Sequence, residues 1–139
     1  MTYLWPQQIV RIRIDPTKDI YFCYLGISYG GFKKYELAIT ACSKAIELDP
    51  TRAVFFYVLG SYYLPLERYQ DAITSLTEAT KLDPTNVDYF YALGNAYRYL
   101  GQYQEAIAPF TEATKLDPTN VKCFHDLSNA YRYLDQNQE

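Results

Sequence analysis

The chain has 139 residues, of which 49% are hydrophobic and 21% charged, and its formal net charge is -3. This composition is typical of a folded globular domain and excludes disordered and collagen-like chains. Because 13 Lys and Arg residues face 16 Asp and Glu residues, there is no basic excess, and we expect no nucleic-acid partner. No apolar run reaches the length of a membrane span, and Pro6 breaks the first one. We therefore expect a cytoplasmic protein with no membrane partner.

The residues that usually carry chemistry are few. The three cysteines, Cys23, Cys42 and Cys123, are odd in number and match neither a disulfide framework nor a zinc site, which favours a reducing compartment. His125 is the only histidine, and the sequence holds no Gly-rich phosphate loop and no serine-nucleophile motif. We therefore expect no cofactor, no bound metal, no catalytic residues and no enzymatic activity.

The sequence repeats itself at a fixed interval. Ten residues at 77–86 recur verbatim at 111–120, and a series of Leu-Gly pairs and tyrosines keeps the same offset. These pairs and tyrosines are Leu25-Gly26, Leu59-Gly60, Leu93-Gly94, Tyr29, Tyr63, Tyr97 and Tyr131. The interval divides the chain into units at 19–52, 53–86 and 87–120, with a partial fourth unit at 121–139.

Each unit is predicted to form two amphipathic helices, because its apolar residues recur every three or four positions. An Asp-Pro pair follows each second helix, as at Asp83-Pro84, and proline there cannot continue the helix. The residues that follow, Thr85 and Asn86 in one unit and Thr119 and Asn120 in the next, have side-chain oxygens that can cap the following helix.

In these features the chain resembles the tetratricopeptide repeat (TPR) family, which is built from 34-residue helix–turn–helix units. The residues that carry the resemblance, besides the Leu-Gly pairs and tyrosines, are Phe22, Phe56, Phe90 and Phe124; Ala38, Ala72 and Ala106; Ala45, Ala79 and Ala113; and Pro50, Pro84 and Pro118. The resemblance implies an all-α fold, a right-handed α-solenoid of antiparallel hairpins. The glycine and alanine positions are expected to lie where helices approach closely, so that larger side chains would force them apart.

Several positions depart from this pattern. Residues 1–18 are expected to form a degraded capping segment with a helix over about 6–14, although the alternating run from Ile9 to Ile14 favours an extended arm instead. Pro65 is expected to shorten a first helix, and Pro109 to bend a second one. Ser128 replaces glycine in the fourth unit and should add bulk at a close contact.

The partial unit 121–139 is predicted to be a first helix that serves as a terminal cap. Without a second helix it would expose an apolar stripe of Leu127, Ala130, Tyr131 and Leu134, through which the chain could form a homo-oligomer. The alternatives are a cap with a tolerated exposed face and a chain that is a fragment of a longer protein.

The resemblance also implies where a ligand would bind. In TPR proteins the first helices line a concave groove that takes peptide segments. The candidate binding residues are Tyr57, Ser61, Tyr91, Asn95, Arg98, Tyr99, Lys122, His125, Asn129, Arg132 and Tyr133, and Ile20, Cys23 and Ile27 fall at the same places in the first unit. Tyr and Arg often anchor interfaces. We therefore expect a non-catalytic module that binds a partner's peptide in a Tyr/Arg-lined groove; the alternative is a self-assembling scaffold.

Some TPR proteins grip a terminal carboxylate with a clamp of Lys and Asn. Asn95, Asn129 and Lys122 match parts of that clamp, but Tyr57, Tyr91, Ala92 and Asp126 stand where it needs other residues. We therefore do not expect that specificity. An acidic or phosphorylated segment that contacts Arg98, Lys122 and Arg132 remains an open alternative, as does a tyrosine-rich surface left by duplication of one ancestral hairpin.

Overall fold

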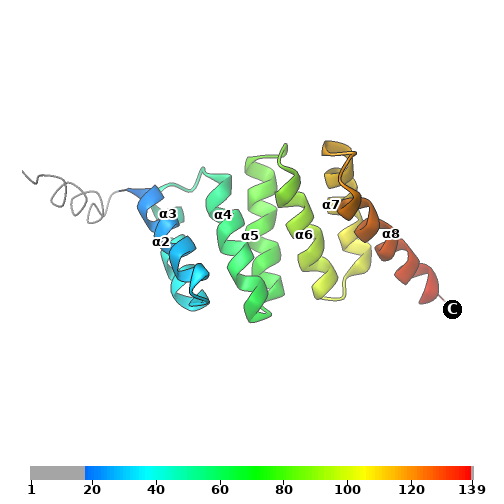
Figure 1. The fold of residues 1–139 in the computed structure, drawn as a ribbon, viewed down its shortest axis with the longest axis horizontal. Coiled ribbons are helices and arrows are strands. Elements are labelled where there is room, and N and C mark those ends of the chain that lie inside the picture. The colour runs from blue at the N-terminus through cyan, green and yellow to red at the C-terminus, as the bar shows by residue number, and fades with distance from the viewer. Residues whose placement is uncertain (1–17, 139) are drawn as a thin grey trace, which may run out of the picture.

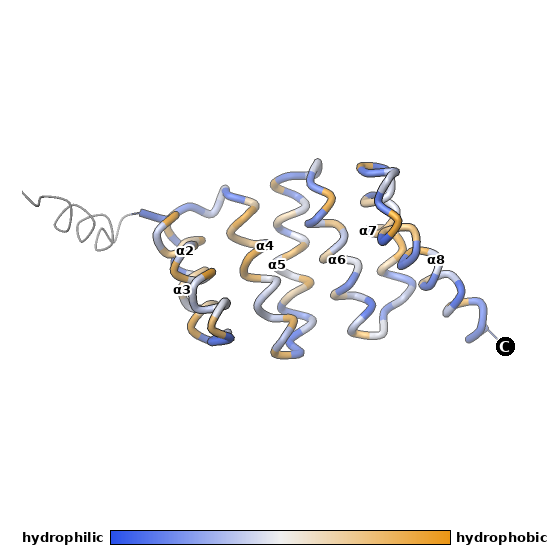
Figure 2. Tube along the Cα trace, in the orientation of Figure 1, coloured by the Kyte–Doolittle hydropathy of each residue, from blue (hydrophilic) through white to orange (hydrophobic). Residues whose placement is uncertain are grey.

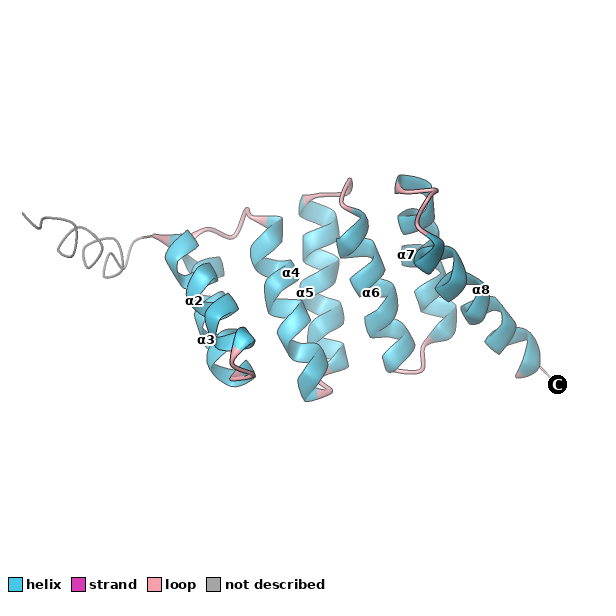
Figure 3. Ribbon diagram, viewed as in Figure 1, coloured by secondary structure: helices cyan, strands magenta, loops and turns pink. Residues whose placement is uncertain are grey.

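The computed structural model describes residues 18–138, which are almost entirely helical (Figures 1 and 3). The helices are α2 (Asp19–Gly31), α3 (Tyr35–Leu48), α4 (Ala53–Tyr63), α5 (Tyr69–Leu82), α6 (Val87–Tyr99), α7 (Tyr103–Leu116) and α8 (Val121–Gln136), with a short 3-10 helix η1 (Leu64–Leu66) after α4. No strand occurs in this part of the chain. The predicted capping helix at about 6–14 and its alternative, an extended arm, lie outside the described residues.

The helices form three antiparallel hairpins, α2/α3, α4/α5 and α6/α7, which stack side by side along the long axis of the molecule (Figure 1). Each second helix also packs against the first helix of the next hairpin, and α8 packs against α7 at the C-terminal end. Consecutive hairpins therefore share their apolar faces, as expected for a solenoid in which stability comes from stacking. This arrangement confirms the predicted α-solenoid.

Each hairpin turns at a residue with left-handed backbone conformation. These residues are Lys33 (φ 59°), Glu67 (φ 58°) and Gly101 (φ 81°), and they occupy equivalent positions in successive units. Only glycine adopts this conformation without steric cost. Asp135 occupies the corresponding position in α8, which continues through it as a helix to Gln136.

The junctions between hairpins close through a repeated hydrogen-bond pattern. In the second junction the Oδ1 atom of Asp83 accepts hydrogen bonds from the backbone nitrogen of Thr85 at 3.0 Å and from its hydroxyl at 2.6 Å. These bonds lower the pKa of the Asp83 carboxyl. The following residue, Asn86, caps α6 by accepting a hydrogen bond from the backbone nitrogen of Asp88. The predicted helix caps are therefore confirmed for the asparagines, which accept hydrogen bonds from the next helix. The threonines instead donate hydrogen bonds to the preceding aspartate.

Small residues lie where the two helices of a hairpin approach each other. A Cβ atom added to Gly60 would lie 2.6 Å from Cγ of Leu76, and one added to Gly94 would lie 2.6 Å from Cδ1 of Phe110. Both distances are shorter than carbon atoms tolerate, and the facing alanines, such as Ala72 and Ala106, are fully buried. The predicted close approach at these positions is confirmed.

The other departures have mixed outcomes. Pro65 does shorten its helix, because α4 ends at Tyr63 and η1 contains the proline. α7 runs from Tyr103 to Leu116 with Pro109 inside it, and a bend at that residue stays a prediction. The expectation for Ser128 is wrong. Its side chain is exposed, since none of the described helices packs on that side of α8.

Hydropathy follows this packing along the solenoid (Figure 2). Apolar and polar stretches alternate along the hairpin helices, whereas α8 becomes hydrophilic toward its C-terminal end. Between residues 18 and 138 there is no helix of the length and apolarity that crossing a membrane requires.

Candidate functional site

The predicted binding residues lie on the first helices α4, α6 and α8, and we call the surface they form the first-helix surface. Its N-terminal part is occupied by aromatic packing. The ring of Tyr57 lies against that of Tyr89, with centroids 4.9 Å apart, and burial raises the pKa of Tyr57. Ser61 donates its hydroxyl hydrogen to the Tyr57 carbonyl at 2.8 Å. Tyr57 is therefore half-buried by the fold and offers only part of its ring to a ligand.

In the middle of the surface, Tyr91 contacts residues of the neighbouring helix α8. Its phenolic oxygen donates a hydrogen bond of 2.5 Å to Oδ2 of Asp126, and the ammonium group of Lys122 lies 5.5 Å from the centre of its ring. Burial and the hydrogen bond to Asp126 raise the pKa of Tyr91 to about 12. Two predicted site residues, Tyr91 and Lys122, are thus in contact with each other.

Farther along, two Asn–Arg pairs repeat from one helix to the next. In α6, Arg98 donates to the side-chain oxygen of Asn95 through Nη2 at 2.8 Å, and its guanidinium lies 4.8 Å from the centre of the Tyr99 ring. In α8, Arg132 donates to Asn129 at 2.5 Å. The amide of Asn129 also lies 3.2 Å from Nδ1 of the exposed His125. The pairs fix the guanidinium groups in space.

Two pairs of stacked tyrosines stand beside these arginines. The rings of Tyr69 and Tyr99 are 5.7 Å apart, and those of Tyr103 and Tyr133 are 3.7 Å apart. In each pair one ring comes from the start of a second helix and the other from the end of the next first helix. The sequence pattern predicted Tyr99 and Tyr133 as site residues but not Tyr69 and Tyr103, although their recurrence at the repeat interval was a signal.

Each tyrosine pair borders a hollow of the surface. The apolar hollow has a volume of about 300 Å³ and is lined by Ser61, Leu64, Pro65, Tyr69 and Tyr99. The cationic hollow has a volume of about 230 Å³ and is lined by Arg98, Tyr103, Asn129, Arg132, Tyr133 and Gln136. The structure therefore brings Arg98, Asn129, Arg132 and Tyr133 together around one hollow and places Ser61 and Tyr99 around the other.

Two residues do not have the roles expected for them. Cys23 was expected to line the groove in the first unit, but it is buried against Cys42 and Phe55 in the core, and that expectation is wrong. Asp126 was expected only as a mismatch to the clamp. It is in fact buried and accepts the Tyr91 hydrogen bond. Nothing in one sequence links two residues that lie so far apart along the chain.

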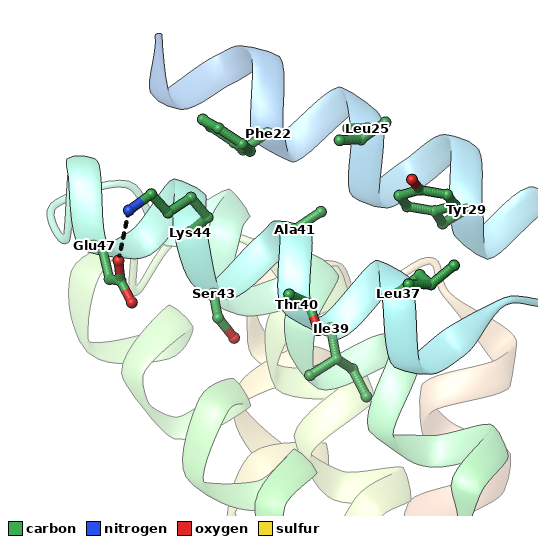
Figure 4. Close-up of a pocket in the computed structure, with 10 residues that line it drawn as sticks. All are labelled: Phe22, Leu25, Tyr29, Leu37, Ile39, Thr40, Ala41, Ser43, Lys44 and Glu47. Atoms are coloured by element: carbon green, nitrogen blue, oxygen red, sulfur yellow. Dashed lines mark hydrogen bonds and ion pairs between the residues drawn. The ribbon is translucent and has the colours of Figure 1, made fainter. Parts of the chain in front are cut away.

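A larger hollow, of about 640 Å³, lies elsewhere, between α2 and α3 at the N-terminal end of the described stack (Figure 4). Figure 4 shows Phe22, Leu25 and Tyr29 of α2 above the α3 side chains that line the other wall. The residue equivalent to Leu25 in the next hairpin, Leu59, is buried against α3. Within residues 18–138, the hollow therefore lies on the face of the first hairpin that corresponds to the face of the second hairpin packed on α3.

The cysteines and acidic residues offer little chemistry. All three cysteines are buried, and burial raises the pKa of the Cys42 thiol to about 12, so its reactive thiolate is scarce. No three His, Cys, Asp or Glu side chains within residues 18–138 are grouped so as to hold a metal ion.

The predicted apolar stripe on α8 is partly wrong. Ala130 is fully buried because it faces α7, and Leu127 and Leu134 are half-buried. The exposed apolar residues of this helix are Val121 (78% exposed), Phe124 (46%) and Tyr131 (51%), together with Tyr133 on the first-helix surface. The face that lacks a covering helix therefore centres on Phe124 and Tyr131.

Comparisons with known proteins agree with this architecture. A comparison with curated protein sequences gives no match. The chain is similar to the crystal structure of MamA, with 26% identity, a TM-score of 0.84, and coverage of 93% of this chain and 74% of that one. It is also similar to the second TPR domain of human RPAP3 in complex with the HSP70 peptide SGPTIEEVD, with 27% identity, a TM-score of 0.77, and coverage of 81% and 94%.

A third similar structure is the first TPR of Spaghetti (RPAP3) bound to the HSP90 peptide SRMEEVD, with 23% identity, a TM-score of 0.82, and coverage of 89% and 98%. Two family models, both described as tetratricopeptide repeat, match residues 22–52 and 57–121, which together make up most of the chain. The chain therefore belongs to the tetratricopeptide repeat family.

Proposed function

We propose that this chain is a non-catalytic protein-interaction module that binds a peptide segment of a partner protein on its first-helix surface. The observation that carries the proposal is the row of two hollows, each bordered by a stacked tyrosine pair, on helices whose apolar faces are already used for packing. Such concave sites with rigid aromatic walls and a few polar groups are typical of ligand-binding surfaces.

The comparisons support this function. The second TPR domain of human RPAP3, which is 27% identical to this chain, was solved with a bound peptide. That likeness makes a peptide the first kind of ligand to test. The residues we assign to binding are those that line the hollows, namely Ser61, Arg98, Tyr99, Asn129, Arg132 and Tyr133, together with Asn95, which holds Arg98. Tyr57, Tyr91, Lys122 and His125 belong to the same surface outside the two hollows.

Two tyrosine variants test the proposal. Tyr99 and Tyr131 are each 51% exposed on first helices, but only Tyr99 borders a hollow. Peptides selected from a phage-displayed random library on the folded chain would be titrated calorimetrically against the parent, Tyr99→Ala and Tyr131→Ala. We expect Tyr99→Ala to weaken binding about tenfold or more and Tyr131→Ala to leave it unchanged. Equal affinity for all three proteins, or no selectable peptide, would contradict the proposal.

A second function is favoured by the exposed face of α8. Phe124 and Tyr131 stand where a second helix covers the equivalent residues of α6, so another copy of the chain could cover them and build a homo-oligomeric scaffold. Sedimentation velocity of the parent, Phe124→Asp and the control Phe32→Asp tests this candidate, because Phe32 is exposed on a turn of another hairpin. A parent that stays monomeric at tens of micromolar would rule it out for this chain.

A further inference from the structure

We propose that the cationic hollow binds a carboxylate side chain of a peptide ligand and that the apolar hollow binds an apolar side chain of the same peptide. This inference rests on the peptide-binding function proposed above and specifies the chemistry of its ligand. It starts from the relation between the two hollows, which share three equivalent places of consecutive units.

Three equivalent places line both hollows, and one of these three changes its chemistry. The other lining residues belong to one hollow only: Ser61 and Pro65 to the apolar one, and Asn129, Arg132 and Gln136 to the cationic one. Leu64, Tyr69 and Tyr99 line the apolar hollow, and their equivalents in the next unit, Arg98, Tyr103 and Tyr133, line the cationic one. The tyrosine walls are thus kept while leucine becomes arginine. Arg132 adds a second guanidinium from α8. The repeated scaffold therefore presents one apolar and one positively charged hollow in a fixed order along the first-helix surface.

The charge of the cationic hollow is not neutralised by any residue between 18 and 138. Arg52 pairs with Asp19 and Asp49, and Arg68 pairs with Asp71. By contrast, Arg98 and Arg132 form no ion pair with any carboxylate in the described part of the chain, and no acidic residue lines their hollow. An anionic group entering this hollow would meet two positive charges and no negative one.

The two guanidinium groups are held in place and still have donors to spare. Each carries five N–H donors. Arg98 directs Nε and Nη2 to one oxygen, that of Asn95, and Arg132 directs Nη2 to Asn129. The remaining N–H groups can donate to a carboxylate in the planar two-point geometry that arginine favours. Because the Asn95 amide and the Tyr99 ring already hold the Arg98 side chain, little further ordering of that side chain accompanies binding.

The middle of the surface does not offer the same chemistry. There the Asp126 carboxylate accepts the Tyr91 hydrogen bond, and its negative charge lies near Lys122 and Tyr91. An acidic ligand group is therefore directed to the hollow beside Arg98 and Arg132.

The spacing of the hollows sets the pattern of the ligand. They lie on consecutive units, and two adjacent residues of α6, Arg98 and Tyr99, line one hollow each, so a single short peptide can reach both. We expect ligands that carry an apolar residue and, a few positions away, an Asp or Glu.

The experiment uses the full chain and two phage-displayed libraries of random short peptides, one without Asp and Glu codons and one without Lys and Arg codons. The tightest binders would be synthesised in three forms, with the acidic residue kept, changed to its amide, or replaced by phosphoserine. Their affinities would be measured calorimetrically for the parent, the double variant Arg98→Gln/Arg132→Gln, and the control Lys81→Gln/Lys115→Gln. The control removes the same charge from two exposed lysines at equivalent positions of successive second helices.

We expect binders mainly from the library that retains Asp and Glu, with a loss of about tenfold or more on amide substitution and in the arginine variant but none in the lysine control. Circular dichroism verifies that the arginine variant is folded, and Arg98→Lys, which keeps the charge but not the planar fork, should show an intermediate loss.

The outcomes separate this inference from the broader function. Peptides that depend on Tyr99 but are neutral, or that bind the arginine variant as well as the parent, would overturn the carboxylate site and leave the peptide-binding function standing. A phosphoserine form that binds more than about tenfold tighter than the acidic form would overturn the choice of a carboxylate. Peptides that depend on neither Tyr99 nor the arginines would overturn both proposals.

Discussion

The phenolic hydrogen of Tyr91 in α6 is donated to the carboxylate of Asp126 in α8, which joins the first helices of two neighbouring units by a single 2.5 Å hydrogen bond. Because Asp126 is buried, its charge depends on this partner for solvation. The last helix, which packs against the stack on one side only, is therefore tied to it by a polar contact as well as by apolar packing.

Replacing Tyr91 by phenylalanine should destabilise the fold. The variant removes only the donor and leaves a buried carboxylate oxygen without its hydrogen bond, which costs about 1–3 kcal/mol of the free energy of unfolding. Urea unfolding followed by far-UV circular dichroism measures the change. Tyr131→Phe is the matched control, because Tyr131 is exposed on the unpartnered face of α8, and it should change stability by no more than about 0.5 kcal/mol. Equal losses in the two variants would contradict the role of the bond.

The same tyrosine predicts a pH dependence. Burial and the Asp126 hydrogen bond raise its pKa from 10 to about 12 in the folded chain, so the folded state holds the phenolic proton more tightly than the unfolded state. Its contribution to stability is fully present below pH 10 and is lost as the pH rises toward 12. The stability difference between the parent and Tyr91→Phe should therefore narrow over this interval. A difference that stays constant would show that Tyr91 ionises normally.

The close approach of the two helices in each hairpin predicts opposite effects for two glycines, one inside that contact and one outside it. In Gly94→Ala the new methyl group would lie 2.6 Å from the Phe110 ring, which is fully buried and cannot move freely, so we expect a loss of about 1–3 kcal/mol. At Gly31 nothing lies within 4 Å of an added Cβ atom. Gly31→Ala should gain up to about 1 kcal/mol from helix propensity. Thermal unfolding of both variants checks the sign of the stability change. A stabilised Gly94→Ala would show that the two helices do not pack tightly at this position.

The turns inside the hairpins predict another pair of opposite effects. Lys33 and Gly101 occupy equivalent positions with left-handed backbone conformation. Lys33→Gly should stabilise the chain by about 0.5–1 kcal/mol, because it removes the steric cost of a side chain there, and Gly101→Ala should destabilise it by about 1 kcal/mol. Chemical denaturation of both variants measures the two changes. If they have the same sign, turn conformation is not what governs these positions.

Much of the fold could be predicted from the sequence because it depends on local, repeated signals. These signals act within one or two helices: the regular repeat interval, the small residues between the two helices of a hairpin, and the proline after each second helix. Helix pairs and their close contacts follow from them directly. Pro65 shows the same principle, since a proline near a helix end acts on its own turn and shortens that helix as expected.

The details of the candidate site could be predicted only in part, because they depend on contacts between helices that are distant in the sequence. Cys23 is buried against Cys42 and Phe55, Asp126 is buried and accepts the Tyr91 hydrogen bond, and Tyr103 of a second helix stacks on Tyr133 of the next first helix. The pattern of a single unit contains no information about these contacts. It also suggested a stripe with Ala130 at its centre, whereas the side chain faces α7.

Each junction of the solenoid is closed by an aspartate and the threonine two residues later, with nearly the same distances at Asp49, Asp83 and Asp117. These bonds involve no atom of the neighbouring hairpins. A further repeat unit could therefore be inserted at any of these junctions, and each inserted unit would add one more hollow for a ligand side chain. Evolution or a protein engineer could lengthen the recognised peptide sequence in this way, and the side chains that line the new hollow would set its chemistry.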